Sequence, residues 1–86
     1  MDATNPILKA FGAALREKRR AAQLSQMELA DRSDLHRTYI ADIERGARNI
    51  SLLSIARLAH GLGTTMSGLL NGVGDNTPPA SRGTGI

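Results

Sequence analysis

The sequence contains no cysteine and no tryptophan, and its only aromatic residues are Phe11 and Tyr39. Without cysteine the chain cannot form disulfide bonds or zinc–thiolate sites. With two aromatic residues it cannot offer the platform of stacking side chains on which many proteins hold single-stranded bases. The core must therefore be built from aliphatic side chains.

The chain is also too short for several classes of protein. Its 86 residues make one small domain, which excludes a multidomain enzyme. No apolar run approaches the roughly 18 residues that span a bilayer, and the N-terminus carries no cationic signal region, so we expect a cytoplasmic protein. Eleven Lys and Arg residues against eight Asp and Glu give a net charge of +3, which favours nucleic acid as a partner.

The spacing of apolar residues predicts an all-α domain of five helices, because it follows three- and four-residue steps and lacks period-two alternation. The helices are expected at about residues 6–23, 26–33, 37–45, 52–60 and 66–71, which together make a domain of residues 6–71. Asn5 is expected to cap the first helix, and Ser25 with Glu28 to form a capping box. Residues 1–5 are expected to form an N-terminal extension, and the Gly- and Pro-rich residues 72–86 a flexible tail.

Two charged residues fall on apolar helix faces. On a helical wheel Arg19 lies within the stripe of Leu8 and Leu15, and Glu44 lies beside Ile40 on the third helix. Burying either ion alone would cost several kcal/mol, so we predict that Arg19 and Glu44 pair and join the first helix to the third. The alternative is that Arg19 reaches solvent along its aliphatic stem and that Glu44 lies at a frayed helix end.

The charged run at residues 16–20 is otherwise expected to be a solvated helix face. Steps of 100° spread its charges around the helix, so the run should add only long-range attraction for an anionic partner. The opposite side of the third helix and the residues that follow it differ, because their side chains are types that hydrogen-bond to bases and phosphates rather than the Lys, Glu and Gln of an ordinary solvated face. These residues are Arg37, Thr38, Tyr39, Arg45, Arg48 and Asn49.

Residues 26–45 resemble the helix-turn-helix of the lambda-repressor-like family, the Cro/repressor or Xre type. The residues that carry the resemblance are Ser25-Gln26-x-x-Leu29-Ala30, Leu35, Ile40 and Ile43-Glu44-Arg45-Gly46, continued by Ser51-Leu52, Leu58-Ala59 and Leu62-Gly63. Asp34 stands where the family usually has glycine, so we expect a left-handed backbone there at a cost of about 1 kcal/mol. Within the family, residues 36–49 look most like the controller proteins of restriction-modification systems.

The resemblance implies a bacterial, nucleoid-associated transcriptional regulator that binds double-stranded DNA by sequence, with the third helix in the major groove and the second across the phosphates. The residues expected to read bases are Arg37, Thr38, Ala41 and Asp42. The residues expected to contact phosphates are Gln26, His36, Tyr39, Arg45, Arg48 and Asn49. Asp42 has a second interpretation, which is an ion pair with Arg45 one turn later.

A homodimer on a pseudo-palindromic operator is expected, because one such domain reads only a few base pairs. The wheel of the fourth helix puts Leu52 on the core stripe and Leu53 off it, and Met66 and Leu70 add apolar surface on the fifth helix. Leu53, Met66 and Leu70 are therefore expected at the dimer interface, unless they simply fill a small core. The protein should be a repressor or autoregulator; the alternative is an antitoxin-like protein-interaction module with the same fold.

Catalytic and ligand-binding motifs are absent from the sequence. Residues 63–68 have the glycine spacing of a P-loop, but Leu69 and Leu70 stand where Lys and Ser or Thr are required. His36 and His60 lie on different elements, and no cysteine is present to complete a metal ligand set or a nucleophile and base pair. We therefore expect no enzymatic activity, no cofactor, no metal and no small-molecule effector within this chain.

Overall fold

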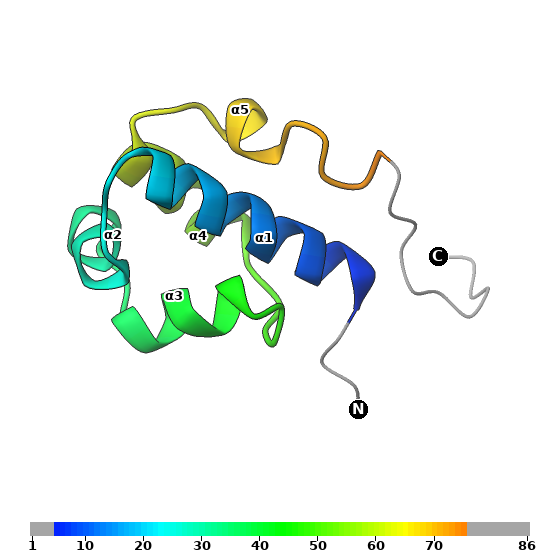
Figure 1. Ribbon diagram of the computed structural model, residues 1–86, viewed down its shortest axis with the longest axis horizontal. Coiled ribbons are helices and arrows are strands. Elements are labelled where there is room, and N and C mark those ends of the chain that lie inside the picture. Colours follow the sequence, from blue (N-terminus) through cyan, green and yellow to red (C-terminus); the bar gives the residue numbers. More distant parts are fainter. Residues whose placement is uncertain (1–4, 76–86) are drawn as a thin grey trace.

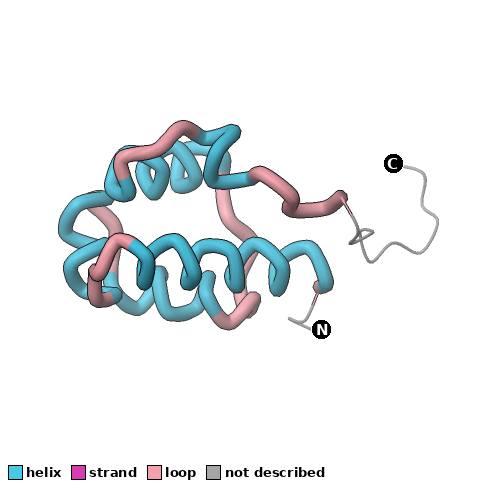
Figure 2. Tube along the Cα trace, turned by 45° about the horizontal axis from the view of Figure 1, so that its top comes forward, coloured by secondary structure: helices cyan, strands magenta, loops and turns pink. Residues whose placement is uncertain are grey.

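The computed structural model describes residues 5–75, and this part of the chain forms five helices and no strand (Figures 1 and 2). The helices are α1 (Pro6–Ala21), α2 (Gln26–Ser33), α3 (Arg37–Glu44), α4 (Leu52–Leu62) and α5 (Met66–Leu70). The all-α fold with five helices is therefore confirmed. The predicted ends were too late for α1, α3 and α5 and too early for α4, while residues 1–4 and 76–86 lie outside the described residues.

Side chains of the flanking residues satisfy the free backbone N–H groups at the starts of four helices. The Asn5 side chain accepts from the backbone N–H of Ile7, and Ser25 and Glu28 form the predicted capping box over 3.0 and 2.8 Å. Ser51 and Thr65 cap α4 and α5 in the same way. α1 ends earlier than predicted because Gln23 adopts a φ of 61°, a left-handed conformation that glutamine does not favour and that was not predicted.

All five helices contribute to one aliphatic core. Its fully buried large side chains are Leu15, Leu29, Ile40, Ile43, Leu58 and Leu69, and Phe11 is buried beside them. α1 packs against α3 on one side and α5 on the other, while α2 packs against α3 and α4 (Figure 1). Burial of this kind contributes about 1.5 to 3 kcal/mol for each large aliphatic side chain, which explains how so short a chain folds without disulfides.

Three side chains lie differently from their predicted positions. Leu8 is only half-buried near the start of α1, and Leu52, predicted on the core stripe of α4, is 72% exposed. Leu52 is the first residue of its helix, where the chain has not yet reached the core. Val73 was assigned to the tail, yet it packs partly buried against the core. Among residues 5–75, no helix combines the length and apolar character that spanning a bilayer requires.

Candidate nucleic-acid interface

The connection between α2 and α3 fixes the angle between these helices. Asp34 follows α2 with a φ of 57°, the left-handed conformation that the sequence predicts at this position. Leu35 then donates its backbone N–H to the carbonyl of Ala30 over 3.0 Å and packs partly buried against the core. Only residues 34–36 separate the two helices, so α3 is held rigidly against α2.

α3 has one buried side and one side that faces solvent. The buried side carries two isoleucines and Glu44. The four residues predicted to read bases lie away from it, since Arg37 and Thr38 are exposed and Ala41 and Asp42 are half-buried. These four side chains therefore share one accessible surface of α3, which we call the outer face.

Two arginines that follow α3 in the chain engage Asp42. Its carboxylate forms an ion pair with Arg45, and its second oxygen lies 3.4 Å from Nη1 of Arg48. The local ion pair, which was the alternative interpretation of Asp42, is thus present in the structure. Arg45 and Arg48 remain mostly exposed, so both can turn their remaining N–H groups to another acceptor.

Tyr39 is half-buried and points toward α4. Its hydroxyl donates to Oγ of Ser54 over 3.1 Å, and the guanidinium of Arg48 lies 4.9 Å from the centre of its ring. Tyr39 therefore supports Arg48 from below through a cation–π contact. His36 and Asn49, also predicted to contact phosphates, are exposed before and after α3.

The carboxylate of Glu44 is the most heavily bonded group near the outer face. Its side chain is 0% exposed, and that of Arg19 is 10% exposed. Arg19 donates from Nε to Oε2 over 2.6 Å and from Nη2 to Oε1 over 3.0 Å, while its Nη1 donates to the carbonyl of Leu24. The structure thus brings together the two charges that the wheels placed on apolar faces, in a bidentate pair that links α1 to α3.

Two further side chains donate to the same carboxylate. Gln26 donates from Nε2 to Oε1 over 3.0 Å, and Nε of Arg16 lies 3.4 Å from the same oxygen. Burial alone raises the pKa of the Glu44 carboxyl, but hydrogen bonds from Arg19 and Gln26, together with the charge of Arg19, hold that pKa below its ordinary value. Gln26, predicted to contact a phosphate, therefore has its side chain directed to Glu44 at the start of α2.

A groove of about 610 Å³ lies between α1 and the end of α3, beside this pair. We call it the α1–α3 groove, and its lining residues are Lys9, Ala13, Arg16, Glu17, Arg20, Glu44 and Arg45. The groove was not predicted from the sequence, because within residues 16–20 alone the charges do not share one face of the helix. The signal was the spacing of Lys9, Arg16 and Arg20, which share one face of α1 at steps of seven and four residues.

The three residues predicted at a dimer interface lie in different surroundings. Leu53 is 60% exposed next to the exposed Leu52, whereas Met66 and Leu70 are partly buried against the core. The apolar surface available to a partner is therefore centred on the first turn of α4 rather than on α5.

Comparisons with known proteins relate most of the chain to DNA-binding regulators. Residues 15–69 match the helix-turn-helix family. The chain is 46% identical over 69 residues to the control protein C.BamHI of Bacillus amyloliquefaciens, an overlap of 79% of this chain and 85% of that protein. It is 36% identical over 66 residues to the immunity repressor protein of Bacillus phage phi105, which covers 77% of this chain and 44% of that protein.

Comparison with solved structures also relates the chain to DNA-binding regulators. The structure is similar to the restriction-modification controller protein C.AhdI from Aeromonas hydrophila, with a TM-score of 0.71 and 47% sequence identity over 72% of this chain and 94% of that chain. It is also similar to the clp gene regulator ClgR from Corynebacterium glutamicum, with a TM-score of 0.71 and 33% identity over 74% of this chain and 68% of that chain.

Proposed function

Because the chain belongs to the helix-turn-helix family, we propose that it binds a pseudo-palindromic operator in double-stranded DNA as a homodimer. The members of this family are DNA-binding transcription regulators and not enzymes. The observation that carries this proposal is the outer face of α3. It holds Arg37 and Thr38 exposed on a helix that a short turn and a buried ion pair fix to its neighbours.

The side chains of the outer face have the chemistry for the two kinds of DNA contact. Arg37 can donate two hydrogen bonds to guanine, Thr38 can present its methyl to thymine, and Ala41 allows close approach. Asp42 can accept from a cytosine amine only if it releases Arg45 or Arg48. The phosphate contacts are assigned to Gln26, His36, Tyr39, Arg45, Arg48 and Asn49. Gln26 would use the second N–H of its amide, since the first donates to Glu44.

Repression, including repression of its own promoter, is the regulatory activity we assign to the protein. Its similarity to a phage immunity repressor and to control proteins supports this assignment. A regulator of this kind acts on the chromosome, so we propose a location in the cytoplasm at the nucleoid. Neither a cofactor nor an effector is required by the proposed mechanism, because occupancy of the operator alone blocks transcription.

In vitro selection from random duplex DNA at a stated salt concentration tests the proposal most directly. We expect a selected sequence with two related half-sites about 10 to 10.5 base pairs apart, or a multiple of that spacing. Binding should weaken steeply between 50 and 200 mM salt because phosphate contacts release counterions. No enriched sequence, combined with salt-insensitive capture of a protein partner, would instead favour the protein-interaction module.

Replacing Arg37 with alanine should weaken binding to the selected duplex by about 1 to 3 kcal/mol and relax the preference at one base pair per half-site. The reason is that a bidentate contact to guanine discriminates between bases, whereas a phosphate contact does not. Competition binding with every single-base variant of the duplex measures both effects. Arg57→Ala is the matched control, since Arg57 is exposed on α4 and its loss changes the net charge equally. An equal loss of affinity for all sequences would reassign Arg37 to phosphate.

The homodimer is supported by the exposed leucines at the start of α4. Two adjacent leucines that are 72% and 60% exposed form an apolar surface that a two-fold axis could bury against itself. Dimerisation also explains how a domain with one short recognition helix can reach useful specificity.

Leu53→Glu should convert the protein from dimer to monomer, raising the dimer dissociation constant by at least about tenfold, because two carboxylates would meet across the symmetry axis. Sedimentation without DNA at tens of micromolar measures this. The melting temperature of the wild type should rise with protein concentration, as expected for a dimer, whereas that of Leu53→Glu should not. Met27→Glu is the matched control, since Met27 is similarly exposed but lies on α2. A wild-type protein that sediments as a monomer would contradict the proposed interface.

A further inference from the structure

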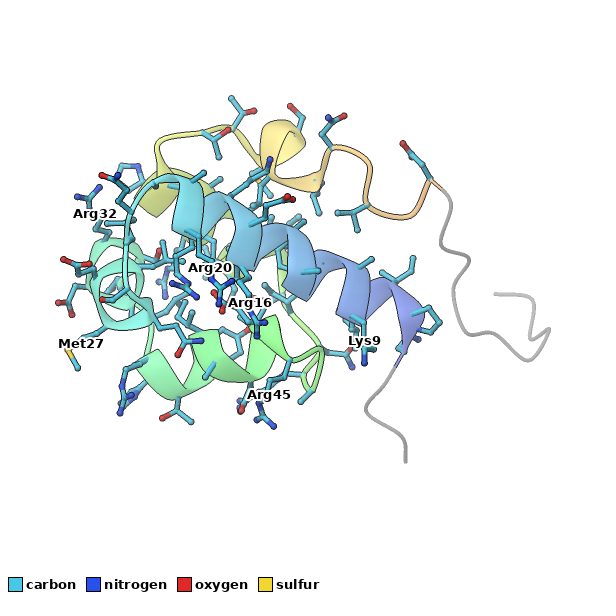
Figure 3. The ribbon with its side chains drawn as sticks, in the orientation of Figure 1. Lys9, Arg16, Arg20, Met27, Arg32 and Arg45 are labelled. Carbon is cyan, nitrogen blue, oxygen red and sulfur yellow. The ribbon has the colours of Figure 1, made fainter. Side chains whose placement is uncertain are left out.

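One face of α1 carries cations along most of the helix. Lys9, Arg16 and Arg20 share this face with the small residue Ala13, and all four line the α1–α3 groove. Figure 3 shows the three cations following one another along α1, on the side of that helix that faces α3. From Lys9 to Arg20 the helix rises about 16 Å at 1.5 Å per residue.

The groove has an excess of positive charge that is not neutralised within it. Four of its lining residues are cations and two are carboxylates, but Glu44 already forms a bidentate pair with Arg19, and Arg45 an ion pair with Asp42, so three cations stand against one carboxylate. The remaining carboxylate belongs to Glu17, which is exposed. An anion entering the groove therefore meets a net attraction.

The donors of these cations are available to a ligand. Lys9 and Arg20 are exposed and form no ion pair within residues 5–75. Arg16 approaches Glu44 only through Nε, at 3.4 Å, so the described contacts leave its terminal nitrogens unused. Ala13 lies between Lys9 and Arg16 along this face, where a short side chain leaves room for a phosphate-sized group.

We propose that the α1–α3 groove binds backbone phosphates of the same DNA duplex whose major groove receives α3. This inference rests on the proposed function and extends it to a second surface, on α1. The groove is continuous with the outer face, because Arg45 lies at the end of α3 and lines the groove. It is also joined to the start of α2, because Gln26 and Arg16 donate to the same oxygen of Glu44.

The length of the cationic face favours a polymer of phosphates over a single small anion. Neighbouring phosphates of one strand of B-DNA are separated by more than their axial rise of about 3.4 Å, because the strand winds around the axis, and a row of donors about 16 Å long can still contact more than one of them. A lone phosphate would engage only one or two of the cations. The phosphates bound here would add affinity without adding sequence preference.

Salt titrations of variants that each lack one positive charge test the proposal. Arg20→Gln, and separately Arg16→Gln, should each reduce the slope of log K against log salt by about 0.9 for each bound protomer, which is about fivefold in affinity at 0.15 M salt. The probe is the selected duplex, and the loss should be equal on a duplex with a scrambled operator. Arg57→Gln removes the same charge from α4 and should leave the slope unchanged.

Thermal melts verify that each variant is folded. Arg20 is the better site for this test, because it forms no ion pair within residues 5–75, whereas Arg16 contacts Glu44.

Neutral phosphate analogues locate the contact. Methylphosphonates introduced singly along the duplex should weaken binding of the wild type at positions that become silent in the Arg20→Gln protein. Slopes of Arg16→Gln and Arg20→Gln equal to that of Arg57→Gln would overturn the inference while leaving the proposed function intact. Submillimolar binding of tripolyphosphate without any change in the DNA slope would also overturn it, in favour of a small-anion site. If the wild type binds no DNA, both the proposed function and this inference fail.

Discussion

Arg19→Ala is expected to destabilise the folded protein by about 3 to 5 kcal/mol at neutral pH, the cost of leaving a buried charge without its partner. Glu44 would stay fully enclosed and ionised, with only Gln26 and a longer contact to Arg16 in compensation. The carbonyl of Leu24 would lose its donor as well. For a domain whose total stability lies near 5 to 15 kcal/mol, the loss is a large fraction. Urea denaturation of wild type and variant measures it.

The double replacement Arg19→Met with Glu44→Met separates pairing from mere burial. Removing both charges leaves apolar groups of similar volume, so the double variant should recover most of the stability lost by either single variant. Arg57→Ala, an exposed arginine on α4, provides the control and should change the free energy of unfolding by less than about 0.5 kcal/mol. A loss of that small size from Arg19→Ala would mean that water solvates both charges.

Acid provides a second signature of the same pair. Because the pKa of Glu44 is lower in the folded protein than in the unfolded chain, its contribution to stability is present above the unfolded pKa and disappears as pH falls through the folded pKa. In Arg19→Ala burial raises the pKa of Glu44 instead, so that variant is penalised at neutral pH and relieved as the carboxyl takes up a proton. The difference in stability between wild type and variant should therefore shrink as pH falls from the raised pKa of Glu44 in the variant to its lowered pKa in the wild type, an interval that contains the ordinary glutamate pKa of about 4.3.

The Arg19–Glu44 pair was predictable because each of the two helices, taken separately, places a charged residue on an otherwise apolar face. When one apolar helix face carries a cation and another carries an anion, pairing the two avoids the large free-energy cost of burying either charge alone. The participation of Gln26 and Arg16 was not predictable in this way. It depends on the distances among α1, α2 and α3, which no wheel of a single helix contains.

The predictions that were wrong for Leu52 and for the cations of α1 failed because they considered each helix alone. Leu52 occupies a core position on the wheel of α4, but as the first residue of that helix it extends beyond the core. The cations of α1 look scattered within residues 16–20 and form one face only when Lys9 and the end of α3 are included. Periodicity within one helix predicts which way a residue points, whereas tertiary contacts decide what it meets.

Gly12 lies where α1 crosses α3, and there two physical effects of opposite sign compete. In an isolated helix Gly12→Ala would be stabilising by about 0.5 to 1 kcal/mol, since glycine loses more backbone entropy than alanine. In the folded protein the added Cβ would clash with the carbonyl oxygen of Ile43 and lie 2.7 Å from that of Glu44. These are backbone atoms at the end of α3, which cannot rotate away as a side chain can.

We expect the steric effect to win and Gly12→Ala to lower the free energy of unfolding by about 3 kcal/mol, at the upper end of overpacking penalties. Urea denaturation measures the loss, and Gly68→Ala on α5 is the matched control. There the nearest atoms are both side-chain oxygens, Oγ1 of Thr64 at 2.6 Å and Oγ1 of the capping Thr65 at 3.1 Å, which can shift as backbone atoms cannot, so the change should stay within about 1 kcal/mol. A Gly12→Ala protein as stable as the wild type would mean that α1 and α3 are farther apart than described. Since the close approach of α1 and α3 also sets the distance between Arg19 and Glu44, the same variant should reduce the coupling energy of that pair.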